Sequence, residues 1–214
     1  MKERRKAVVQ SAPVILWSLI VQQSKLNIEN ISCHESQLRN VILPILRGTV
    51  FHVTNRLGFK GIVKDGLIRH NKNEEFPHSY VTSARSHARE RGRVSLFDLR
   101  STSDNELETA LSNYYFLNPP LTKNNPIFLI FSTSLYPALI SWTQARDENA
   151  GREAYIPHVE TFHQGDISTS EVIRVVSVKI ARTRRRLSAD SRLLDTCVSQ
   201  LYRPARLPSR SKPR

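Results

Sequence analysis

Cysteine and glycine are scarce in this chain of 214 residues. Its two cysteines, Cys33 and Cys197, lie far apart and neither belongs to a CxxC motif, which excludes a zinc ribbon and a disulfide-rich scaffold. There are only 7 glycines, and neither GxxxxGK[ST] nor GxGxxG occurs, so P-loop and Rossmann nucleotide sites are not expected. The histidines show no zinc-like spacing, so no metal site is expected either.

Long hydrophobic runs are also missing. The apolar stretch at residues 14–21 is far shorter than the roughly 20 residues that a membrane span needs. A basic segment precedes it, as in a signal peptide, but no small-x-small cleavage site follows. We therefore expect residues 14–26 to form a core helix that begins near Pro13. The sequence predicts a soluble, cytoplasmic protein with no membrane partner.

What the chain does have is a folded core and a strong positive charge. Hydrophobic residues make up 39% of the sequence, which is enough for a globular domain. Its 32 Lys and Arg against 19 Asp and Glu give a net charge of +13, which favours a negatively charged partner. Arginine is concentrated at residues 182–186, so we interpret 182–214 as a basic, disordered tail. Such a tail binds DNA or RNA phosphates or is simply a solvated terminus.

Hydrophobic periodicity predicts an α+β fold of short strands separated by short helices. The β-branched run at 49–54 is typical of a strand, residues 57–64 of a helix that ends at Gly66, and residues 126–131 of a buried central strand. Further strands are expected at 79–82, 94–99, 155–162 and 172–180, and further helices at 37–46, 83–90, 106–115 and 135–146. We divide the chain into an N-terminal helical segment (1–48), a central domain (49–181) and the tail (182–214).

Three polar residues lie on or beside predicted strands. His52 is within an apolar strand, Tyr80 is on the second strand, and Glu160 is in the strand expected at 155–162. A carboxylate in such a run is costly unless it is paired or faces a cleft. Each residue alone is weak evidence, but their order along the chain is more specific.

This order resembles that of the ADP-ribosyltransferase superfamily, in its His-Tyr-Glu branch. Residues 51–68 resemble the first motif, residues 80–88 the second, and residues 160–178 the Glu motif of the DarT group of nucleic-acid-modifying toxins. Over 49–181, the resemblance implies a catalytic domain with a split mixed β-sheet and short helices that binds NAD between its two halves. It implies a mono-ADP-ribosyltransferase that uses NAD as substrate and modifies nucleic acid or a nucleic-acid-associated protein. A bacterial toxin or phage-defence effector, with an antitoxin as a possible partner, is the setting it implies.

The resemblance also implies roles for individual residues. Glu160 would be the catalytic residue that stabilises the positive charge developing on the ribose. His52, supported by Thr54, would bind the adenosine-side ribose. Tyr80 would stack on the nicotinamide ring. Ser83 would cap its helix or reach the nicotinamide ribose.

Alternatives remain open at this point. Glu153, seven residues before Glu160, is a second candidate for the acid. His52 and Tyr80 are also compatible with ordinary core positions, and Glu160 with an exposed edge strand. As a whole, the chain is also compatible with a non-catalytic, basic nucleic-acid-binding module, or with an RNA 2′-phosphotransferase-like enzyme.

Overall fold

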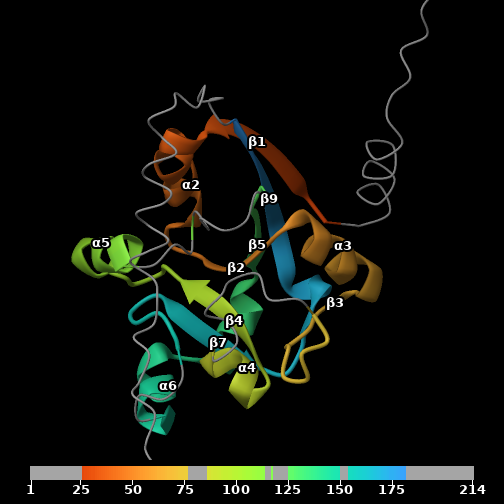
Figure 1. Ribbon diagram of the computed structural model, residues 1–214, viewed down its shortest axis with the longest axis vertical. Coiled ribbons are helices and arrows are strands. Elements are labelled where there is room, and N and C mark those ends of the chain that lie inside the picture. The colour runs from red at the N-terminus through yellow and green to blue at the C-terminus, as the bar shows by residue number, and fades with distance from the viewer. Residues whose placement is uncertain (1–25, 77–85, 114–116, 118–124, 150–153, 182–214) are drawn as a thin grey trace, which may run out of the picture. The chain divides into compact units, whose positions relative to one another are not determined.

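The computed structural model describes residues 26–76, 86–113, 117, 125–149 and 154–181. The chain divides into two units, Met1–Ala181 and Arg182–Arg214, and every described residue belongs to the first. That unit is a mixed α+β structure with a mostly antiparallel sheet and short helices (Figure 1), as the sequence predicts at this level. The strand expected at 79–82, the basic tail and all but the last residue of the helix expected at 14–26 lie outside the described residues.

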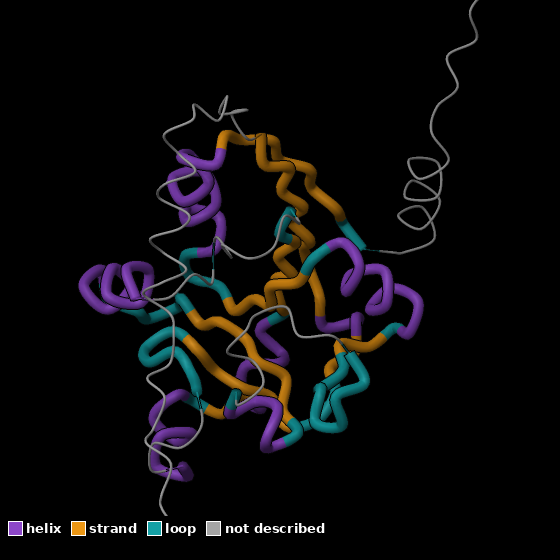
Figure 2. The backbone as a smooth tube through the Cα atoms, in the orientation of Figure 1, coloured by secondary structure: helices purple, strands orange, loops and turns teal. Residues whose placement is uncertain are grey.

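The strands form one large sheet and one small one (Figure 2). The seven-stranded sheet has the order β1-β9-β5-β2-β4-β7-β6, in which β1 and β9 run parallel and all other neighbours are antiparallel. Its strands are β1 (Ile28–His34), β2 (Val50–Thr54), β4 (Arg93–Asp98), β5 (Ile127–Phe131), β6 (Leu139–Ile140), β7 (Glu160–Gln164) and β9 (Val172–Ala181). The small sheet pairs β3 (Leu67–Ile68) with β8 (Ile167–Ser168).

Inside the large sheet, pairing is shortest between β2 and β4, where it is as short as that of the edge strand β6 with β7. These strands pair only through Val50 with Asp98 and Phe51 with Phe97. By contrast, β2 and β5 pair over four residues, and β4 and β7 over five. We call β1-β9-β5-β2 the first half of the sheet and β4-β7-β6 the second half. Beyond Phe51, β2 pairs with β5 alone.

The helices cover both faces of the sheet. They are α2 (Leu38–Leu46), α3 (Arg56–Asp65), α4 (His87–Arg91), α5 (Asp104–Asn113) and α6 (Trp142–Asn149). One core cluster joins Phe51 and Phe128 to α2 and α5, and another joins Val50 and Leu129 to Phe59 of α3. Since neighbouring residues of a strand point to opposite faces, Val50 and Phe51 belong to different clusters, one on each face of the sheet.

Two of the helices begin and end at residues suited to those positions. The Asn55 side chain accepts hydrogen bonds from the backbone N–H groups of Leu57 and Gly58 in α3, and Gly66 ends this helix with φ of 69°. Ser86 caps α4 in the same way, and Gly92 ends it with φ of 65°. The described part of the predicted helix at 83–90 therefore begins after Ser86, while Ser83 lies outside the described residues.

Three segments differ from the sequence-based expectation. The helix expected at 135–146 is a 3-10 turn (Thr133–Ala138), then β6, then α6, because β6 pairs with β7. The strand expected at 155–162 begins only at Glu160. An unexpected strand, β1, lies within the segment 1–48 and pairs with β9 along its whole length.

Candidate functional site

Glu160 is the first residue of β7, and its carboxylate is held by two hydrogen bonds. The side chain is buried, with 7% exposed. The Ser95 hydroxyl of β4 donates to Oε1 at 2.6 Å, and the Ile156 backbone N–H donates to Oε2 at 2.6 Å. The Glu160 N–H in turn donates to the Ile156 carbonyl at 3.0 Å, so the turn before β7 closes around its own carboxylate.

Burial dominates the acid–base behaviour of Glu160. Desolvation raises the pKa of this carboxyl from 4.5 to about 7, against the opposing effect of the bonds from Ser95 and Ile156, which favour the charged form. A carboxyl with a pKa in this range exchanges its proton near neutral pH. It can therefore stabilise a cation or accept a proton at that pH, as a catalytic acid or base must.

Ser95 connects Glu160 to the first half of the sheet. Its hydroxyl binds Glu160, while its carbonyl oxygen accepts a hydrogen bond at 2.9 Å from Nδ1 of His52 on β2. The sequence analysis did not select Ser95. A usable signal was present, because Ser95 is polar and occupies the strand face of β4 that it shares with the buried Phe97.

His52 has a defined tautomer in this arrangement. Because a carbonyl oxygen only accepts, Nδ1 carries the hydrogen, and Nε2 is the acceptor nitrogen of the neutral ring. Burial lowers the pKa of His52, which favours the neutral form near pH 7. An Nε2 acceptor suits a hydroxyl donor, such as a ribose hydroxyl.

The side chains of His52 and Glu160 leave the sheet on opposite faces. Phe51 is opposite Phe97, and Phe97 is opposite Glu160, so these three side chains share one face. His52 follows Phe51 and therefore points to the other face. The two side chains therefore do not converge on one face of the sheet, and Ser95 joins them through its hydroxyl and its carbonyl oxygen.

Thr54 ends β2 close to the start of α3. A Cβ atom at Gly58 would lie only 2.3 Å from the Thr54 hydroxyl oxygen, so glycine at this position allows the helix to approach the end of the strand. The other predicted site residues, Tyr80 and Ser83, and the alternative acid Glu153 lie outside the described residues.

The turn before Glu160 contains a residue in an uncommon conformation. His158 has φ of 68°, a left-handed value that a non-glycine residue adopts only a few per cent of the time. Its Nδ1 lies 2.9 Å from a carboxylate oxygen of Glu106 on α5, and its ring lies 4.5 Å from the Trp142 ring of α6. The sequence analysis gave His158 no role, and its neighbours fix the turn that holds Glu160.

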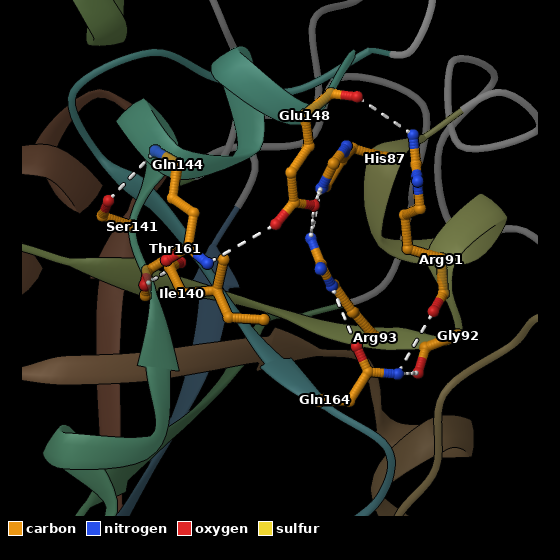
Figure 3. Close-up of polar contacts among 10 residues, drawn as sticks. All are labelled: His87, Arg91, Gly92, Arg93, Ile140, Ser141, Gln144, Glu148, Thr161 and Gln164. Atoms are coloured by element: carbon orange, nitrogen blue, oxygen red, sulfur yellow. Dashed lines mark hydrogen bonds and ion pairs between the residues drawn. The ribbon is translucent and has the colours of Figure 1, made fainter.

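An ion-pair cluster lies on the same strand face as Glu160, at the opposite end of the β4–β7 pair (Figure 3). Arg93 of β4 donates to Glu148 of α6 at 2.7 Å, to Nε2 of His87 at 2.7 Å and to Gln164 of β7 at 3.1 Å. The centroid of the His87 ring lies 4.8 Å from that of the Phe162 ring. Phe162 lies between Glu160 and Gln164 on β7 and so separates the cluster from Glu160. The pair with Arg93 lowers the pKa of Glu148. The cluster joins α4 and α6 to the second half of the sheet.

Comparison of the chain with protein-family models, with curated proteins and with solved structures finds no match. Over the described ranges, no group of three or more His, Cys, Asp or Glu side chains is arranged to hold a metal ion. Within the same ranges, no helix combines the length and the apolar character needed to cross a membrane.

Proposed function

We propose that this protein is an NAD-dependent ADP-ribosyltransferase in which Glu160 is the catalytic carboxylate. The observation that carries the proposal is the chain of contacts from Glu160 through the Ser95 hydroxyl, and from the Ser95 carbonyl to His52. The two residues that the sequence predicts for NAD are thereby joined by a third. The narrow connection between the two halves of the sheet supports the same proposal, since the resemblance implies NAD between such halves.

The proposed chemistry assigns a distinct task to each group. Cleavage of the nicotinamide–ribose bond develops positive charge on the ribose, and the ionised Glu160 carboxylate stabilises it. Ser95 positions that carboxylate by its hydroxyl. Nε2 of His52 accepts a hydrogen bond from a ribose hydroxyl on the adenosine side, with Thr54 beside it. Tyr80 stacks on nicotinamide, and Ser83 reaches the nicotinamide ribose.

The test is nicotinamide release from NAD by the purified full-length chain. We expect Glu160→Gln to lower turnover about 100-fold or more, because one electrostatic stabiliser of a transition state contributes about this much. Glu108→Gln, at an exposed carboxylate of α5 paired with Arg39, is the matched control and should keep full turnover. Glu153→Gln tests the alternative acid. Undiminished release by Glu160→Gln would overturn the assignment of the acid.

The pH profile tests the proposed role of Ser95. Because the ionised form of Glu160 is required, turnover should rise with pH through about 7, the pKa of this carboxyl. Ser95→Ala removes a hydrogen bond that favours the charged form, so its profile should shift to higher pH. A profile that is unchanged in Ser95→Ala would contradict the positioning role.

The same assay separates the proposal from other functions of a basic chain. Absence of turnover together with salt-sensitive DNA or RNA binding would favour a non-catalytic module. Transfer of a 2′-phosphate from RNA to NAD would favour a phosphotransferase. For a toxin, expression of the wild type should slow bacterial growth, and expression of Glu160→Gln should not.

A further inference from the structure

The outward side of α3 carries a row of cations. Arg56, Lys60 and Lys64 follow one another at intervals of four residues, which places them on neighbouring turns about 6 Å apart. Phe59 and Ile62 hold the opposite side of the helix in the core. Arg56 and Lys64 are exposed, and Lys60 is partly so.

This row opposes the stability of its own helix. Like charges four residues apart destabilise a helix by roughly 0.2–0.5 kcal/mol per pair, and the row contains two such pairs. Arg56 also lies in the first turn, where the helix dipole disfavours a cation, and that turn contains no acidic residue. Local electrostatics that work against the local structure are expected at functional sites.

Elsewhere in the described part of the chain, basic side chains are commonly neutralised. Arg39, Arg69 and Arg174 each pair with a carboxylate. Within that part, no ion pair is found for Lys60 or Lys64. The one acid of α3, Asp65, pairs with Arg69.

The outward side of α3 is also open to solvent beside the row. Leu57 is 71% exposed, and a side chain at Gly61 would meet nothing within 4 Å. An elongated polyanion can therefore approach the backbone of α3 along the row. A single exposed leucine is too little apolar surface for a helix that lies in a membrane interface. The row also begins two residues after Thr54, at the end of the strand that carries His52.

We propose that α3 binds the phosphate backbone of a nucleic acid through Lys60 and Lys64, with Arg56 at the end nearest the site. The inference rests on the proposed function, for which it names nucleic acid as the acceptor. It assigns the contact to a helix of the folded unit, whereas the sequence analysis expected it only in the tail. The contact is to phosphate and so carries no base specificity.

The test is the salt dependence of binding by the full-length chain to a fluorescein-labelled single-stranded DNA of about 12 nucleotides, without NAD. Each phosphate contact contributes about 0.7 to the slope of log affinity against log salt. Lys60→Gln with Lys64→Gln should therefore lower the slope by about 1.4. The control removes two exposed lysines elsewhere, Lys72→Gln with Lys179→Gln, and should leave the slope unchanged. Equal losses in both double variants, or no loss in the α3 variant, would overturn the proposal.

Lys60→Glu distinguishes lost binding from a damaged fold. It replaces two repulsive pairs on α3 by attractive ones, so its Tm should equal or exceed that of the wild type while DNA affinity falls. A lower Tm with lower affinity would contradict this. Nicotinamide release without DNA should be unchanged in the α3 variants, which separates failure of this inference from failure of the proposed function. Loss of binding to phosphatidylserine vesicles but not to DNA would identify a membrane surface and overturn the proposal.

Discussion

The two halves of the large sheet use burial differently. In the first half, β5 is an uninterrupted apolar strand with all five residues buried. In the second half, polar groups are buried among the apolar ones, including Glu160 and Thr161 on β7. Each of these is satisfied, Glu160 by Ser95 and Thr161 by the Ile140 carbonyl. The first half therefore supplies cohesion, while the second half holds polar groups that are costly to bury in fixed positions.

The largest expected effect is a loss of stability when a buried ring is removed from the first half. Phe128 is fully buried on β5, and its ring centroid lies 5.9 Å from that of Phe51. Phe128→Ala should lower the free energy of unfolding by about 3–5 kcal/mol, through lost burial and the cavity left behind. Denaturant unfolding measures the change. Phe76→Ala, at a side chain that is 38% exposed, is the control and should cost far less. A loss of under 1 kcal/mol for Phe128→Ala would refute the cohesive role.

The next largest effect is the free-energy cost of burying the ionised Glu160 carboxylate in the second half. Its folded pKa of about 7 exceeds its ordinary 4.5, so between these values the folded state binds a proton that the unfolded state has lost. The free energy of unfolding therefore falls as pH rises from 4.5 to 7, by about 3 kcal/mol.

Unfolding of the wild type and of Glu160→Gln across this pH range isolates that contribution. Stability of the variant relative to the wild type should increase between pH 4.5 and 7 and then level off. Glu108→Gln, at an exposed carboxylate, should show no such trend. A constant difference between the wild type and Glu160→Gln would mean that the carboxyl titrates normally.

The smallest of the three effects concerns the partly buried ion pair of Arg93 with Glu148 in the second half. Glu148→Gln removes the charge that pairs with Arg93, whose side chain is only 10% exposed, and should cost about 2 kcal/mol. The exposed pair of Arg47 with Asp104 is the control, and Asp104→Asn should cost about 0.5 kcal/mol or less. Equal costs would show that burial of the Arg93 cluster has no energetic consequence. Urea unfolding at pH 7.5 measures both.

The sequence patterns that were predicted well are local ones. The β-branched run of β2 and the apolar run of β5 give the expected strands, and Gly66 ends α3 as expected. The strand β1 was missed because its stability comes from pairing with β9, 147 residues further along the chain. Likewise, residues 135–146 have helical composition, but β6 forms there because β7 offers it a partner.

The candidate site shows the same limit. His52 and Glu160 could be selected from the sequence, since each is polar within an apolar run. Ser95 could not be connected to them, because its contact with Glu160 spans 65 residues and its contact with His52 spans 43. The roles proposed for Tyr80 and Ser83 stay predictions.

The α+β class, the excess of positive charge and the positions of His52 and Glu160 within apolar runs follow from the order of the amino acids. These depend on composition and on spacing along a few turns or one strand. The link from His52 to Glu160 through Ser95, and the placement of the two side chains on opposite faces of the sheet, arise from how the strands are arranged in the fold. The reason is physical: strand register fixes which distant residues become neighbours, and it is set by packing of the whole sheet.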